Sequence, residues 1–186
     1  MATSVRERDE EEFLEEDEEE LICHSVRECL STFNVKLPPE LVDWWEEEAY
    51  VDTEALSMYG KLWLVFEHGH WWDGFEGYIT NDEELFEFWS NMIWKLREAL
   101  ENYLFKGYTK DYDLDYLVLK ESWDAGDGNK LHLLDFKVRD KTGELVFKGY
   151  VEGVMELVKE KSTPDKPYYR FDVYRVELTL PESREP

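Results

Sequence analysis

The chain has 186 residues, a length that suits one domain or one domain with an arm. Its 45 acidic and 21 basic residues give a formal net charge of −24. This balance argues against nucleic acid and anionic membranes as direct partners, because phosphate groups need a basic surface. A basic partner protein or a bound cation is the natural complement.

The acidic residues are concentrated near the start of the chain. Residues 1–60 hold 19 acidic and 4 basic residues, which is more than half of the excess. The first residues have no apolar segment of a secretory signal, and no run approaches a membrane span. The only cysteines, Cys23 and Cys29, would lie about 240° apart on a helix, so neither a disulfide nor a zinc site is expected. These features predict a cytoplasmic protein.

We expect a flexible acidic N-terminus over residues 1–12 and a single domain over 13–186. Its first part, 13–58, should be acidic and helical. A helical pattern runs from Phe13 to Phe33, but it contains the acidic run Glu15–Glu20, whose charges repel at helical spacing. That helix therefore needs packing or a basic partner, and a solvated acidic tail is the alternative.

Pro38–Pro39 begins a second helix that reaches about Tyr50. Trp44 and Trp45 supply its inner side, and at least one of them should be core. The stretch Val51–Tyr59 either extends this helix or forms a connection.

The second part, 59–186, should hold the sheet and one long central helix. Lys61–His68 is continuously apolar in its middle, which predicts a strand buried on both faces. A glycine-rich aromatic loop follows at His68–Gly77. The helix is expected at Asn81–Lys106, begun by a capping box in which Thr80 and Asn81 precede Glu83 and Glu84.

The central helix carries a wide apolar stripe that should face the sheet. The stripe comprises Leu85, Phe86, Phe88, Trp89, Met92, Ile93, Leu96, Ala99, Leu100, Tyr103 and Leu104. Trp94 projects from the opposite side, among Glu87, Glu98 and Glu101. Either the acidic N-terminal helices or a partner must cover it.

The remainder reads as an antiparallel meander with strands at Tyr112–Glu121, Leu131–Arg139, Glu144–Lys159 and Tyr168–Leu180. Ala125–Asn129 has the composition of a hairpin turn, and Gly149 and Gly153 mark bulges or bends. The predicted fold class is α+β: N-terminal helices and one long central helix packed on a curved, mostly antiparallel sheet of about five strands.

Chemical motifs are sparse. His68 and His70 point the same way on an extended segment, and with Asp73 they are weak candidates for a metal site. Asp111, Asp113 and Asp115 alternate along a strand, which fits a solvated face better than a calcium loop. Phosphate loops, nucleophile elbows and paired C-x-x-C motifs are missing, so we expect no cofactor, and a non-enzyme is favoured.

We therefore predict a non-enzymatic acidic interaction protein of the inhibitor, immunity or nucleic-acid-mimic type, which occupies a basic site on a partner. Small immunity proteins against nuclease toxins and viral acidic inhibitors are similar in size and charge. The predicted partner-binding residues are Glu15, Glu16, Asp17, Glu18, Glu19, Glu20, Trp44, Glu46, Glu47, Glu48, Glu87, Trp94 and Glu98. The partner is a basic protein, such as a nuclease or another nucleic-acid-binding protein.

The alternative is a small-molecule-binding or hydrolytic protein with an aromatic pocket around residues 63–78. Stacking on large rings suits planar or sugar ligands. Its lining would be Trp63, His68, His70, Trp71, Trp72 and Tyr116.

Overall fold

The computed structural model describes residues 21–115 and 117–182. They belong to two compact units that divide between Leu64 and Val65. The elements are helices and antiparallel strands, which confirms the α+β class. Eight strands occur among the described residues, where the sequence predicted about five.

The first unit is mainly helical. Its elements are α2 (Val26–Thr32), α3 (Pro39–Glu48), β1 (Ala49–Val51), α4 (Thr53–Tyr59) and the first half of β2 (Trp63–Phe66). Ser25 begins α2, because its hydroxyl accepts a hydrogen bond from the backbone N–H of Glu28 at 3.1 Å. Asp52 begins α4 in the same way, through the N–H of Ala55. Gly60 ends α4 in the left-handed conformation, at φ 61°.

The helix expected from Phe13 to Phe33 is shorter than predicted. Residues up to 20 lie outside the described part of the chain, and residues 21–25 are not helical. The Ser25 cap sets the start at Val26. The second predicted helix is confirmed as α3, with Trp45 fully buried, but it ends at Glu48, and Thr53–Tyr59 is a separate helix.

Cys23 and Cys29 form a disulfide, so the prediction of no disulfide was wrong. Their Cα atoms are 5.1 Å apart, and both residues are completely buried. The angular argument assumed that both residues lie on one helix, but Cys23 precedes the Ser25 cap and is free of helical geometry. Since cysteine usage was one reason to expect a reducing compartment, the cytoplasmic location stays a prediction.

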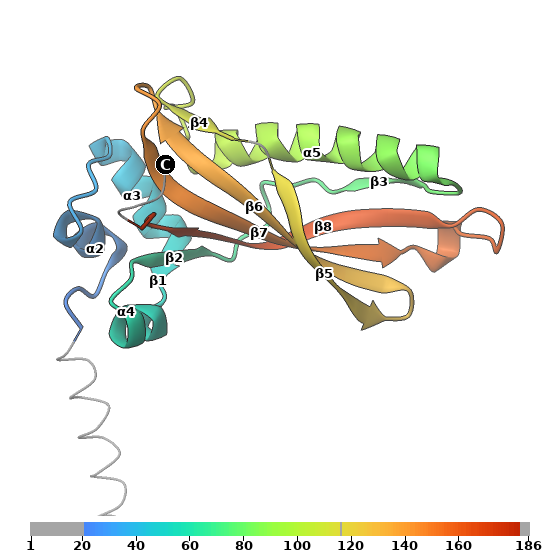
Figure 1. Cartoon of the computed structure of the whole chain (residues 1–186), viewed down its shortest axis with the longest axis horizontal. Helices are drawn as coiled ribbons and strands as arrows, with labels where there is room; N and C mark the ends of the chain where they lie inside the picture. The colour runs from blue at the N-terminus through green and yellow to red at the C-terminus, as the bar shows by residue number, and fades with distance from the viewer. Residues whose placement is uncertain (1–20, 116, 183–186) are drawn as a thin grey trace, which may run out of the picture. The chain divides into compact units, whose positions relative to one another are not determined.

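The second unit holds the sheet and the long helix. From β2 onward, its elements are β3 (Phe75–Tyr78), α5 (Asp82–Leu104), β4 (Tyr112–Leu114), β5 (Val118–Gly126), β6 (Asn129–Asp140), β7 (Leu145–Leu157), a 3₁₀ turn (Lys159–Lys161) and β8 (Tyr168–Thr179). The long strands β6, β7 and β8 lie side by side in Figure 1, in the order β8-β7-β6. β3 pairs with β8, whereas β4 and β5 both pair with β6.

Two features of the sheet were not predicted. β1 and β3 have only three and four residues, too few for an alternating pattern to stand out. The strand expected at Tyr112–Glu121 is broken into β4 and β5, and the alternation shifts at the break. Leu117 is therefore buried, whereas Val118, which unbroken alternation would place on the same face as the buried Leu114, is 57% exposed.

The start of α5 is confirmed. The Asn81 side chain accepts a hydrogen bond from the N–H of Glu84 at 2.9 Å, and the Glu84 carboxylate accepts one from the Thr80 hydroxyl. The apolar stripe is correct from Phe88 onward, but Phe86 is 74% exposed and Leu85 39% exposed. The described ring contacts between α5 and the sheet begin at Phe88 on Phe75 and at Trp89 on His132, so the first turn lies beyond the packed surface.

The sheet face that α5 covers is the core of this unit. His132, Leu134, Phe136 and Val138 of β6 are all buried, as their alternation predicts. A register shift occurs at Gly153, which confirms a bulge at that position. Gly149 remains in regular register opposite Phe136, so it is not a bulge.

Candidate functional site

Trp94 is 69% exposed in the middle of α5, although Met92 and Leu96, two residues to either side, are completely buried. The arrangement follows from the helical period, which turns position 94 away from the sheet. Exposure of so large an indole between two completely buried residues is unusual. In the described part of the chain, most of this ring meets solvent.

The surface around Trp94 is acidic and hollowed. A cavity of about 390 Å³ lies beside the ring and is lined by Trp94, Arg97, Glu98, Glu101 and Asp113. Arg97 bonds to Glu101 and to Asp113, each at 3.2 Å, so it bridges α5 to β4 and leaves Glu98 on the exposed rim. We call Glu87, Trp94, Glu98 and Glu101 the α5 outer face. The hollow itself is lined by the carboxylates of Glu98, Glu101 and Asp113 and by the single guanidinium of Arg97, so it carries excess negative charge.

The other predicted partner-binding residues belong to other parts of the chain. Glu15, Glu16, Asp17, Glu18, Glu19 and Glu20 lie outside the described residues. Trp44, Glu46, Glu47 and Glu48 belong to α3 in the first unit. Glu47 is exposed, and Trp44 and Glu48 are half-buried.

Glu46 has a structural contact inside the first unit. Its carboxylate accepts a hydrogen bond of 2.7 Å from the backbone N–H of Arg27, in the first turn of α2. That contact gives an acceptor to one of the backbone N–H groups that have no partner within the helix at its N-terminus. Arg27 in turn pairs with Asp43, which raises the pKa of its guanidinium. Two carboxylates of α3, those of Asp43 and Glu46, thus bind α2.

The histidine-rich loop does not gather metal ligands. The rings of His68 and His70 lie 5.9 Å apart, and His70 contacts Tyr103 edge-on. Within residues 21–115 and 117–182, no cluster of three His, Cys, Asp or Glu side chains could hold a metal ion. The Asp73 backbone carbonyl accepts a hydrogen bond from Arg170 at 3.1 Å.

The tryptophans of this loop are held by their own chain. The Trp71 indole donates to the carbonyl of His68 at 2.7 Å and stacks on Tyr103. The Trp72 indole donates to the carbonyl of Phe171 in β8 at 3.0 Å. Tyr116, which was expected to line a pocket here, lies outside the described residues. We therefore place no ligand site on this loop.

Asp111, Asp113 and Asp115 do not converge on a cation site. Asp111 pairs with Lys141 at 2.6 Å, Asp113 with Arg97, and Asp115 with Arg139 at 2.9 Å. Because each carboxylate has its own basic partner, this cluster ties α5 and β4 to neighbouring segments.

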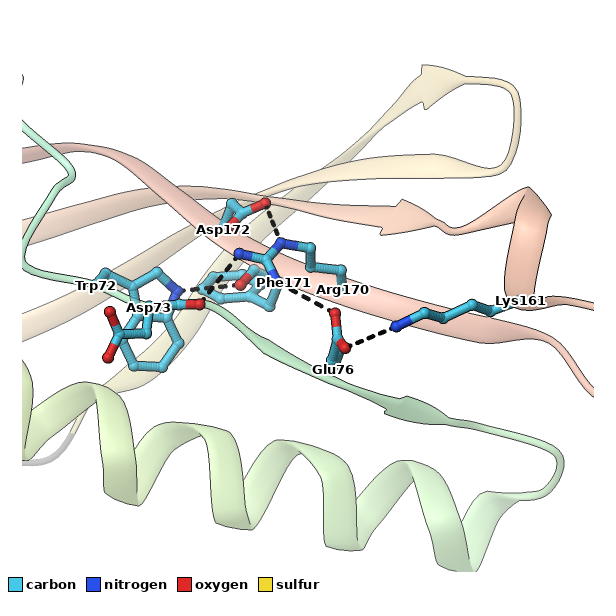
Figure 2. A network of polar contacts seen from close by, with 7 residues as sticks. All are labelled: Trp72, Asp73, Glu76, Lys161, Arg170, Phe171 and Asp172. Atoms are coloured by element: carbon cyan, nitrogen blue, oxygen red, sulfur yellow. Dashed lines mark hydrogen bonds and ion pairs between the residues drawn. The ribbon is translucent and has the colours of Figure 1, made fainter.

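A polar network ties β3 to β8, and Figure 2 shows it between the two strands. The Arg170 guanidinium bonds to Asp172 at 2.9 Å and to Glu76 at 3.2 Å, and Lys161 bonds to the other oxygen of Glu76 at 3.0 Å. The hydrogen bond from Lys161, together with those from Tyr168 and Arg170, lowers the pKa of Glu76. Gly74 is required beside this network, because its φ is 84° and a Cβ there would overlap the guanidinium. The network holds structure and leaves no group free for chemistry.

Sequence reasoning missed a second polar pair, on β5 and β6. The hydroxyl of Ser122 lies 2.7 Å from Nδ1 of His132, its register partner. His132 is only 6% exposed and contacts the Trp89 ring edge-on. Burial lowers the pKa of His132, and the charge of Lys130 lowers it further, so the imidazole is neutral near pH 7. The pairing depends on strand register, which residue spacing alone does not reveal.

Comparison with protein-family models, with curated proteins and with solved structures finds no match to this chain. In the part of the chain that the structure describes, no helix has the length and apolar character needed to cross a bilayer.

Proposed function

We propose that this chain is an acidic interaction protein whose α5 outer face binds a basic site on another protein. The observation that carries the proposal is the 69% exposure of Trp94 in the middle of α5, between the completely buried Met92 and Leu96. Tryptophan is the side chain most enriched at the energetic centres of protein interfaces. Phe86 near the start of α5 is also exposed, at 74%, but Trp94 lies in the stretch of α5 that packs on the sheet.

The chemistry of the partner follows from the surroundings of the ring. Glu87, Glu98 and Glu101 lie at helical spacings of three, four or seven residues from Trp94 or from one another, so they share its side of α5. A lysine or arginine side chain in the hollow would contact the indole face and a carboxylate together. The net charge of −24 favours a basic partner and speeds its approach.

The proposed mechanism is steric occupation of the partner's basic surface. Where that surface ordinarily binds nucleic acid, the chain competes with the phosphate backbone, as an inhibitor or immunity protein does. The acidic run Glu15–Glu20 and the exposed Glu47 extend the predicted binding residues, and their part in the interface stays a prediction.

The test is site-specific photo-crosslinking in extracts of the source cells. A photoreactive residue replaces Trp94 in one protein and Trp123, which is 49% exposed on β5, in a matched control. The crosslinked protein is then identified, purified and titrated against the full chain. Support requires a partner rich in lysine and arginine that crosslinks at position 94 and not at position 123.

The reconstituted complex gives the quantitative readout. We expect Trp94→Ala to weaken binding about tenfold or more and Trp123→Ala to leave it unchanged. Affinity should also fall steeply between about 50 and about 300 mM salt, because screening shortens the reach of the acidic field. A partner that is not basic, or one that binds Trp94→Ala as tightly as the native chain, contradicts the proposal.

A further inference from the structure

A second concave surface lies on the sheet-facing side of α5, away from the α5 outer face. It is a pocket of about 410 Å³ between the N-terminal half of α5 and the hairpin of β5 and β6. This volume is near the lower end of the range of about 300–1,000 Å³ in which small-molecule sites fall. All its lining residues belong to the second unit.

The walls of the pocket are apolar. Leu85 and Trp89 contribute from α5, Leu119 from β5 and Met155 from β7. Leu85 and Leu119 are 39% and 44% exposed, so the folded chain does not fill the space between them. Leu85, which departs from the predicted core stripe, thus borders this open space. An apolar molecule placed here would remove both side chains from water.

The polar side chains of the pocket are few. Ser122, His132 and Lys130 lie on the β5–β6 hairpin, and Tyr169 lies on β8. Lys130 is the one charged group among the described lining residues, and none of them is acidic, although 45 of 186 residues in the chain are. Asp124 lies opposite Lys130 in the strand register but does not line the pocket.

The geometry points to a binding site for a small amphipathic carboxylate, an anion with an apolar tail such as a medium-chain fatty acid. The carboxylate pairs with Lys130 and accepts a hydrogen bond from the Ser122–His132 pair. The tail lies against Leu85, Trp89, Leu119 and Met155. This site is separate from the α5 outer face, and its test does not depend on the proposed function.

The test uses decanoate with the purified full-length chain, at concentrations where decanoate is monomeric. Methyl signals of ¹³C-labelled methionine locate binding, because the chain has only four methionines. Met155 lines the pocket, Met92 is in the core, and Met58 is 62% exposed in the first unit. We expect a saturable shift of the Met155 signal with no shift at Met58.

Dependence on the charge of Lys130 distinguishes this site from an apolar surface that binds decanoate non-specifically. Lys130→Met keeps most of the apolar stem and removes the charge, and it should weaken decanoate about tenfold or more. Lys120→Met is the matched control, because Lys120 is on β5 but pairs with Asp135 and lies over Tyr150, outside the pocket. It should bind decanoate as the native chain does.

Three results would overturn the inference. They are the lack of a saturable Met155 shift, equal decanoate binding by Lys130→Met and the native chain, and binding of decylamine as tight as that of decanoate. The Trp94→Ala variant should bind decanoate normally, so failure of one proposal is distinguishable from failure of the other.

Discussion

The ring of Phe136 lies over Gly149, its register partner on the neighbouring strand, and occupies the space that a side chain at position 149 would need. Both residues are buried, and Phe136 is only 3% exposed, so the ring is enclosed by the folded chain. An aromatic residue that covers a glycine across a strand pair is a known way to stabilise a curved sheet. Glycine is thus needed at position 149 for packing. The sequence alone did not distinguish this role from that of a bulge.

Gly149→Ala should destabilise the second unit by about 1–3 kcal/mol, because an added methyl in a packed core displaces its neighbours. The measurement is urea unfolding followed by circular dichroism. Gly77→Ala is the matched control, since a Cβ at position 77 meets Phe88 at an ordinary 3.6 Å, and it should change stability by less than about 0.5 kcal/mol. Equal effects of the two substitutions would contradict the overlap. The cost of Gly149→Ala should also shrink in a Phe136→Leu background.

Trp94→Ala should cost less than about 1.5 kcal/mol of stability, because the ring is largely exposed in the described structure. Leu96→Ala, two residues away on the same helix but completely buried, should cost about 2–5 kcal/mol. Denaturant unfolding of both variants gives the comparison. A loss of about 3–5 kcal/mol for Trp94→Ala, with partner binding unchanged, would assign the ring to the core and remove α5 from the interface.

Local signals in the sequence located α3, α5 and the three long strands β6, β7 and β8 well. The Asn81 cap and the wide apolar stripe located α5 to within two residues, and alternation on β6 identified its buried face. Features set by pairing between distant segments were missed. β3 exists because it bonds to β8 about 90 residues later, and Ser122 meets His132 only through hairpin register. The helical period predicted that Trp94 points away from the sheet, but the hollow beside it depends on Asp113 of β4.

The network around Glu76 should contribute to stability in a pH-dependent way. Since hydrogen bonds from Lys161, Tyr168 and Arg170 lower the pKa of Glu76, its contribution is fully present above the ordinary glutamate value of about 4.3. It is lost as the pH falls through the lowered folded-state pKa. Unfolding midpoints of the native chain and of Glu76→Gln should therefore differ at neutral pH and converge in strong acid. A difference that persists unchanged in acid would show that the carboxylate charge is not the cause.

His132 should impose a separate pH dependence with its onset at higher pH. Because burial lowers its pKa, the unfolded chain binds a proton at this residue more readily than the folded chain. Stability therefore falls as the pH drops below the ordinary histidine value of about 6.5, until the folded-state pKa is passed. An NMR titration of the His132 ring should give a pKa below that value, and saturating decanoate should shift it upward if the anion binds beside the imidazole. A titration at or above about 6.5 would contradict the burial described for this ring.

The Cys23–Cys29 disulfide should stabilise the first unit, since it closes a loop of six residues' separation around the start of α2. In the chain-entropy treatment, a loop of this length contributes about 2 kcal/mol. The denatured chain, treated with iodoacetamide without reductant, should remain unlabelled at both positions and take up two labels after reduction. Cys23→Ser with Cys29→Ser should lower the unfolding midpoint of the first unit, and Ser25→Ala, which removes only the helix cap, should cost less, about 1 kcal/mol. Labelling of both cysteines in the unreduced protein would contradict the pairing. It would also agree with the cytoplasmic location that the sequence predicts.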